Sequence, residues 1–121
     1  MGNRANIVVV EDDFRVCLYT HWGAPELPDV LRAALIRGQE RWMQASYLTR
    51  IIFSEMIKDR VLSLTGFGIS SELEDGEDMV ILVNVEDQTV HLGNRTFTFD
   101  DFVSSNIGWS ENSDDDDTET P

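Results

Sequence analysis

The sequence predicts an α+β fold with one mostly antiparallel sheet. Strand-like patterns lie near both ends of the chain, two helical patterns lie between them, and strands and helices do not alternate as in parallel α/β proteins. We therefore expect two hairpins in a single sheet, with two central helices packed on one face. Residues 1–109 form a single α+β domain in this interpretation, and residues 110–121 form a disordered acidic tail because they contain no large apolar residue.

A first hairpin is predicted close to the N-terminus. Residues 7–11 are β-branched and apolar, and the acidic run at residues 11–13 forms a polar turn. Apolar and polar residues then alternate over residues 15–20, which predicts the second strand. Gly23 and Pro25 end that strand, because both residue types interrupt regular structure.

Two amphipathic helices are predicted next. The first has apolar residues at helical spacing, namely Leu27, Val30, Leu31, Ala34 and Leu35. We expect it to reach Trp42, although Gly38 weakens its last turns. The second is expected from Ser46, a candidate N-cap, to about Leu62. Its apolar residues, which include Val61, cover a wider arc of the helix surface than those of the first helix. The second helix should therefore be the more buried of the two.

The remaining body is predicted to be mostly strands. Residues 65–71 form a glycine-punctuated loop or short strand, and residues 72–78 carry five acids, which predicts a solvated segment. Residues 79–85 and 89–92 flank a polar turn and form the second hairpin.

A third short strand and a last helix are expected after this hairpin. Residues 95–99 alternate and follow Gly93-Asn94, so they predict an edge strand that a second copy of the chain would pair with in a homodimer. Asp100 is the expected cap of a short helix that contains Phe102.

The charge of the chain limits its partners. The 121 residues include 23 acids and 9 bases, for a net charge of −14, which argues against direct binding to nucleic acid or an anionic membrane. No apolar stretch is long enough for a transmembrane helix or a signal-peptide core, so a cytoplasmic location is expected. The expected partner is a basic protein surface or a nucleic-acid-binding protein.

No pattern of catalytic or metal-binding residues stands out. Cys17 and His21 lie about 13 Å apart in an extended strand, so they do not form a nucleophile–base pair. The second histidine, His91, has no neighbouring ligand pattern either, and the acids at 11–13 lack the alternating oxygen ligands of a calcium loop. The two glycines in residues 65–68 do not make a nucleotide fingerprint. We therefore predict no catalytic residue, metal or cofactor, and favour a binding role over an enzyme.

One cluster of residues has the chemistry of a ligand site. In a hairpin the start of the first strand lies beside the end of the second, so Arg4, His21 and Trp22 are expected to converge at one edge of the sheet. Arg pairs with an anion, Trp stacks on a ring and His forms a hydrogen bond. Alternatively, Trp22 closes the end of the core and Arg4 pairs with an acid. The predicted ligand-binding residues are Asn3, Arg4, Tyr19, His21, Trp22, Arg41 and Arg50.

The N-terminal half carries a recognisable pattern. GNRANIVVV at residues 2–10, followed by YTHWGA at residues 19–24, resembles a set of small uncharacterised bacterial and phage proteins. The resemblance covers most of the body and carries over no catalytic residue. It implies a microbial or phage setting.

Two functions agree with these observations. The first is an acidic, non-catalytic binding protein that sequesters or inhibits a host partner, as a phage counter-defence protein or a DNA-mimic-like inhibitor would. The alternative is a binder of a small anionic, nucleotide-like ligand at the Arg/His/Trp cluster. The acidic residues also have a simpler explanation, which is solubility.

Overall fold

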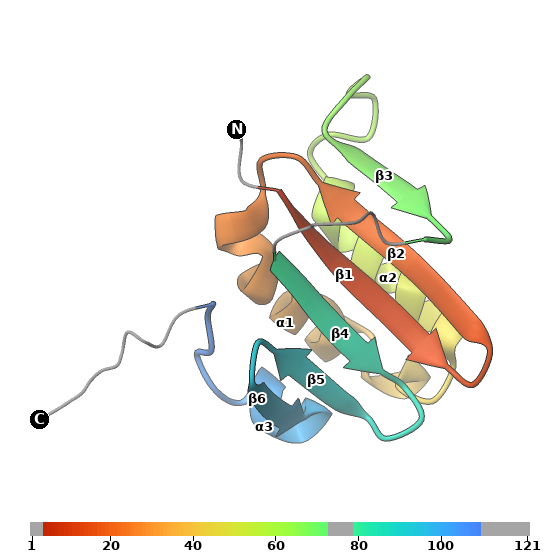
Figure 1. Cartoon of the computed structure of the whole chain (residues 1–121), viewed down its shortest axis with the longest axis vertical. Coiled ribbons are helices and arrows are strands. Elements are labelled where there is room, and N and C mark those ends of the chain that lie inside the picture. The colour runs from red at the N-terminus through yellow and green to blue at the C-terminus, as the bar shows by residue number, and fades with distance from the viewer. Residues whose placement is uncertain (1–3, 73–78, 110–121) are drawn as a thin grey trace, which may run out of the picture.

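The computed structural model describes residues 4–72 and 79–109 and shows an α+β fold built on one mostly antiparallel, six-stranded sheet (Figure 1). The strands are β1 (Ala5–Glu11), β2 (Phe14–Thr20), β3 (Phe67–Ser70), β4 (Met79–Asn84), β5 (Thr89–Leu92) and β6 (Arg95–Thr98). The α-helices are α1 (Leu27–Arg37), α2 (Ala45–Ile57) and α3 (Phe99–Val103), with short 3₁₀ helices at Ala24–Glu26 and Gln39–Arg41. The predicted acidic tail lies outside the described residues, as does most of the acidic segment 72–78.

The strands are arranged in the order β3-β2-β1-β4-β5-β6. β1 and β2 pair antiparallel around the acidic turn, and β4, β5 and β6 form an antiparallel meander. The two groups join through β1 and β4, which run parallel, with Ile7 opposite Ile81. This pairing places the turn after β1 and the turn after β4 at the same end of the sheet. β3 and β6 are the two edges.

Side chains alternate between the two faces of the sheet. Figure 1 shows α1 and α2 together behind the sheet, and the buried strand residues that face them form one core with both helices. The largest fully buried side chains of this core include Ile7, Leu18, Leu31, Leu35, Leu48, Ile52, Ile81, Leu92, Phe99 and Phe102. The opposite face carries Asn6, Tyr19 and His91.

The first helix is shorter than its sequence predicts. α1 ends at Arg37 because Gly38 leaves the helical region, with φ −101° and ψ 24°. A 3₁₀ turn follows, and Trp42 folds back so that its indole N–H donates to the carbonyl of Leu35 at 2.9 Å. Trp42 therefore satisfies a carbonyl near the end of α1 instead of extending the helix.

The second helix also differs from expectation at both ends. α2 begins at Ala45 after Gln44, so Ser46 lies in the first turn and is not the N-cap. The helix ends at Ile57, and Val61 and Leu62 lie beyond it and are exposed. Their apolar pattern continues the helical spacing, but no packing partner covers them in the described part of the chain.

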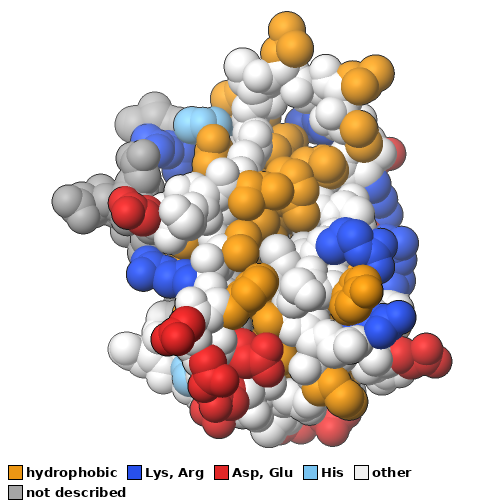
Figure 2. Space-filling model, turned by 90° about the vertical axis from the view of Figure 1, so that its right-hand side faces the viewer, with side chains coloured by type: hydrophobic (Ala, Val, Ile, Leu, Met, Phe, Trp, Pro, Cys, Tyr) orange, Lys and Arg blue, Asp and Glu red, His pale blue; other side chains and the backbone are white. Residues whose placement is uncertain are grey.

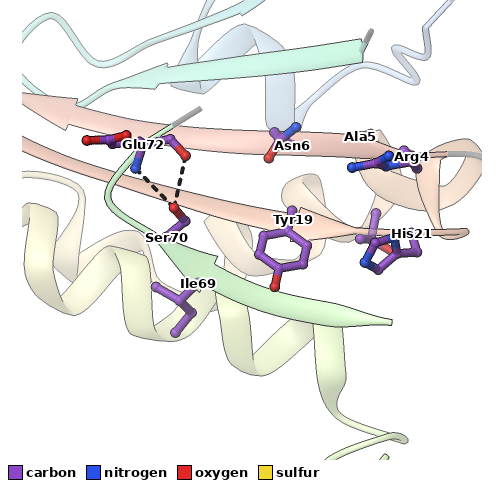
Figure 3. A pocket seen from close by; sticks show the side chains of 9 residues that line it. Arg4, Ala5, Asn6, Tyr19, His21, Ile69, Ser70 and Glu72 are labelled. Carbon is purple, nitrogen blue, oxygen red and sulfur yellow. Dashed lines mark hydrogen bonds between the residues drawn. The ribbon is translucent and has the colours of Figure 1, made fainter. Parts of the chain in front are cut away.

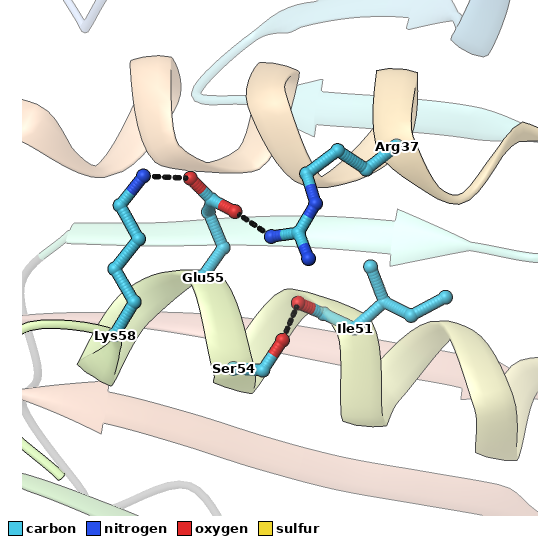
Figure 4. Close-up of polar contacts among 5 residues, drawn as sticks. All are labelled: Arg37, Ile51, Ser54, Glu55 and Lys58. Atoms are coloured by element: carbon cyan, nitrogen blue, oxygen red, sulfur yellow. Dashed lines mark hydrogen bonds and ion pairs between the residues drawn. The ribbon is translucent and has the colours of Figure 1, made fainter.

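Glu55 of α2 is a buried acid that faces α1. Its carboxylate accepts hydrogen bonds from Arg37 of α1 and from Lys58, the latter at 3.0 Å (Figure 4). Burial raises the pKa of the Glu55 carboxyl, but the hydrogen bonds and charges of Lys58 and Arg37 outweigh it and hold the pKa below its ordinary value. Glu55 thus links α1 to α2.

The short last helix and the segment after it are fixed by polar contacts. The N-cap of α3 is Thr98 and not Asp100, because the Thr98 hydroxyl accepts from the Asp101 amide at 3.0 Å. After α3, the indole N–H of Trp109 donates to the carbonyl of Ala24. These bonds hold the chain beside the start of α1.

Candidate functional site

A polar pocket opens at the end of the central strands where the cluster is predicted. Ala5 pairs with Thr20, so the start of β1 does lie beside the end of β2. The pocket has a volume of about 370 Å³. It is lined by Arg4, Ala5, Asn6, Tyr19, Thr20, His21, Ile69, Ser70 and Glu72. The pocket extends from β1 across β2 to β3, which is an edge strand of the sheet.

β3 forms the second wall of the polar pocket. Gly68 lies opposite Tyr19, and a Cβ at position 68 would stand 2.2 Å from the phenol ring, so the ring crosses β3 where no side chain projects. Ser70 is the last residue of β3, and Glu72 follows two residues later; both line the pocket. The sequence analysis did not include these two residues, because the pairing of β3 with β2 joins segments about fifty residues apart and no local pattern signals it.

Asn6 was missed as well, and its environment is unusual. It is only 7% exposed and lines the polar pocket. Among the described residues, the only side-chain nitrogen or oxygen that is fully buried without a hydrogen-bond partner is Arg32 Nε, so the Asn6 amide is accessible to solvent and to a ligand in the pocket.

The polar groups of the pocket follow the length of β2. Figure 3 shows Ser70 and Glu72 at one end, Tyr19 in the middle, and Arg4 and His21 at the other end. Ser70 pairs with Cys17, four residues before His21, so the two ends are about 13 Å apart at about 3.3 Å per residue. One end offers a guanidinium and an imidazole, and the other offers a hydroxyl and a carboxylate.

Trp22 lies next to the polar pocket and not inside it. Its ring centroid is 5.8 Å from that of His21, and His21 in turn contacts Tyr19 edge-on at 5.6 Å. The indole packs on Gly66, which has φ +105° and would place a Cβ 2.9 Å from the ring. Trp22 therefore lines a separate cavity near Phe67.

The remaining predicted residues do not join the pocket. Arg41 and Arg50 both stack on Tyr47, with guanidinium carbons 4.5 Å and 5.6 Å from its ring centroid. They line a different hollow beside the end of α1. Asn3 lies outside the described residues. Arg41 and Arg50 therefore do not line the polar pocket, contrary to the expectation that they bind the same ligand as Arg4 and His21.

A second charged feature is the acidic end of the sheet, which comprises Glu11, Asp12, Asp13, Glu86 and Asp87. The parallel pairing of β1 with β4 brings their two turns together. The charge of Asp12 raises the pKa of the Glu86 carboxyl, and a side-chain hydrogen bond between these two acids adds to the effect. The sequence predicts both turns but not that they lie together, because that depends on the parallel pairing of β1 with β4.

Within residues 4–72 and 79–109, no three His, Cys, Asp or Glu side chains are grouped so that they would hold a metal ion. None of the helices in these ranges is both long and apolar enough to cross a bilayer. Cys17 is fully buried.

The polar pocket thus combines a guanidinium and an imidazole at one end with a hydroxyl and a carboxylate at the other. No protein-family model matches the chain, and neither the curated proteins nor the solved structures contain a significant match.

Proposed function

We propose that the protein is a non-catalytic binding protein whose polar pocket takes a small anionic, nucleotide-like ligand. The observation that carries this proposal is the convergence of Arg4, Tyr19 and His21 in one pocket that the Asn6 side chain also lines. Each group matches a part of such a ligand. The guanidinium and imidazole suit a phosphate, and the phenol ring suits a base or sugar face.

The size and polarity of the polar pocket favour a ligand with two different ends. The anionic group would lie near Arg4 and His21. Hydroxyl groups would lie near Ser70 and Glu72, because a carboxylate accepts hydrogen bonds from hydroxyls and repels a second anion. A nucleoside monophosphate carries its phosphate at one end and hydrogen-bond donors, from the ribose hydroxyls and a base amino group, farther along, and it spans about the length of the pocket. Inorganic phosphate alone would leave the Glu72 end unused.

Native mass spectrometry of the protein, purified gently at low salt from a bacterial host, tests for a retained ligand. Adenosine monophosphate is then the probe in a titration followed by NMR. Arg4→Ala is expected to abolish binding and to keep the fold. Arg50→Ala is the matched control, because it removes the same charge from α2, away from the pocket. Unchanged affinity in Arg4→Ala would reject this site.

A second candidate function rests on the acidic end of the sheet. Glu11 ends β1, and the other four carboxylates lie in the two turns that the β1–β4 pairing holds together. Such a surface would steer the protein to a basic partner, such as the nucleic-acid-binding face of a host protein, and so sequester or inhibit it. A cytoplasmic phage or bacterial setting agrees with this role.

The salt dependence of binding separates this candidate from the first. A host protein retained at low salt should dissociate as salt is added, since the Debye length falls to about 8 Å at 0.15 M. Replacing Glu11, Asp13 and Asp87 by their amides should weaken retention in the same way. A complex that is insensitive to both changes would contradict the role of the acidic end.

A further inference from the structure

Glu72 is held at the far end of the polar pocket by its neighbour Ser70. The Ser70 hydroxyl donates to the Glu72 carbonyl at 2.9 Å and accepts from the Glu72 amide at 3.1 Å (Figure 3). These two hydrogen bonds fix the backbone of Glu72 just after the end of β3. The single hydrogen of the Ser70 hydroxyl is therefore used within the chain, and the Glu72 carboxylate is the charged group at this end of the pocket.

The Glu72 carboxylate has no basic partner in the described part of the chain. Within residues 4–72 and 79–109, no Lys, Arg or His forms an ion pair with it. An ionised carboxylate has two oxygens that only accept hydrogen bonds, so two donors that lie side by side satisfy it best. A ligand edge with a donor next to an acceptor would place that acceptor against a negative charge. Glu72 therefore favours a ligand edge with adjacent donors.

Guanine is the base that presents such an edge. Its ring N1–H and its N2 amino group are neighbouring donors on one side of the base. Adenine and cytosine each present an amino donor next to a ring nitrogen that accepts, and uracil presents one N–H between two carbonyl acceptors. Among these four bases, guanine alone gives a carboxylate two adjacent donors.

The middle of the pocket suits the flat part of a nucleotide. The Tyr19 ring crosses β3 at Gly68, where no side chain projects, and lies between the Arg4–His21 end and Glu72 (Figure 3). A base stacked on this ring would turn its donor edge along β3 toward Glu72 and its sugar and phosphate toward Arg4. The order of phosphate, ring and donor edge in a guanine nucleotide thus matches the order of groups in the pocket.

The basic end of the pocket is also well separated from the acidic end of the sheet. Arg4 precedes β1 and Glu11 is the last residue of that strand, so the two lie about 23 Å apart at about 3.3 Å per residue. Figure 2 shows the red acidic side chains of one face gathered mainly toward its lower end. This separation exceeds two Debye lengths of about 8 Å at 0.15 M salt, so the acidic end does not prevent a phosphate from binding at Arg4.

From these observations we infer that the ligand of the polar pocket is a guanine nucleotide, with its phosphate at Arg4 and His21 and its N1–H and N2 amino groups at the Glu72 carboxylate. The inference rests on the proposed function, because it names the base of the ligand proposed there. It makes Glu72 the residue that selects the base and Ser70 the residue that positions Glu72.

Titration of the full chain with guanosine, inosine and adenosine monophosphate, followed by NMR, tests the choice of base. The Kd of guanosine monophosphate is expected to be at least about ten times lower than that of adenosine monophosphate, since one bidentate pair discriminates by about this factor. Inosine monophosphate keeps the N1–H but lacks the N2 amino group, so its Kd should lie between the two. Equal Kd values would overturn the choice of guanine and leave the proposed function standing, whereas no binding of any of the three would reject both.

Two variants test the assigned residues through the ratio of the two Kd values. Glu72→Gln should remove the preference for guanine, because an amide presents one acceptor and one donor group and pairs well with adenine. Ser70→Ala should weaken the binding of guanosine monophosphate more than that of adenosine monophosphate, because it releases the backbone of Glu72. Glu40→Gln is the matched control, since it removes the same charge from an exposed site beside the end of α1. A guanine preference that survives in Glu72→Gln, or that is lost equally in Glu40→Gln, would overturn the role of Glu72.

Discussion

Tyr19 lies across Gly68 so closely that a methyl group at position 68 would stand 2.2 Å from its phenol ring. Gly68→Ala should therefore turn the ring away from β3. The ring is the far end of a rotatable side chain, so the cost should be at the lower end of the about 1–3 kcal/mol typical of overpacking. Proton NMR of the Tyr19 ring and thermal unfolding measure the two effects.

The control for this change is Gly108→Ala. Gly108 has no heavy atom within 4 Å of an added Cβ, so its substitution should alter neither the Tyr19 signals nor the stability. If Gly68→Ala left the Tyr19 ring unmoved, β3 would not form the wall of the polar pocket as described.

Glu55 should make the protein less stable as the pH falls into the acid range. The folded-state pKa of Glu55 lies below its ordinary value. The ionised carboxylate therefore stabilises the fold above its unfolded-state pKa, and this contribution is lost as pH falls through the folded-state pKa. Glu55→Gln should cost about 1.5–3 kcal/mol at neutral pH, the usual value of hydrogen bonds to charged groups, and should flatten the acid limb of the stability curve.

Urea unfolding over a range of pH measures this effect. Glu40→Gln is the control, since Glu40 is exposed beside the end of α1. The same flattening in Glu40→Gln would show that a general charge effect, and not the link from Glu55 to Arg37 and Lys58, is responsible.

The Asp12–Glu86 pair should change the stability of the protein with pH in the direction opposite to that of Glu55. The Asp12 charge raises the pKa of Glu86, so the folded state binds this proton more tightly than the unfolded state. The pair therefore favours folding at acid pH, and that contribution is lost as pH rises through the folded-state pKa of Glu86. Asp12→Asn should return the pKa of Glu86 toward its ordinary value in an NMR titration.

Asparagine suits this position because Asp12 has φ +53°, a conformation that Asn adopts readily. The turn should therefore keep its shape. An unchanged titration of Glu86 in Asp12→Asn would mean that the two turns of the acidic end do not meet.

Local patterns predicted most of the secondary structure. An apolar, β-branched run indicated β1, and alternation of apolar and polar residues indicated β2 and β6. Two segments that flank a polar turn indicated β4 and β5. The helix ends were less predictable, because Val61 and Leu62 continue an apolar period without being buried. Periodicity describes which residues share a face and not whether another element covers that face.

Strand pairing between distant segments explains why the sequence did not indicate all residues of the polar pocket and of the acidic end. The hairpin alone brings Arg4 close to His21, so that part of the polar pocket was predictable. Ser70 reaches the pocket only because β3 pairs with β2. Likewise, Glu86 reaches Asp12 only because β4 runs parallel to β1. Neither pairing has a signal within a short window of residues.

Trp109 should be important for stability although it lies near the end of the described chain. Its indole N–H donates to the Ala24 carbonyl, its own carbonyl accepts from Arg95, and its ring packs against the core. Trp109→Phe keeps an aromatic ring but removes the indole N–H, and should cost about 1 kcal/mol for the lost hydrogen bond. Trp109→Ala also removes the packing and should cost clearly more, toward the about 3–5 kcal/mol of buried Trp→Ala changes. Chemical denaturation gives both values, and equal stabilities of the two variants would show that the ring contributes nothing beyond its hydrogen bond.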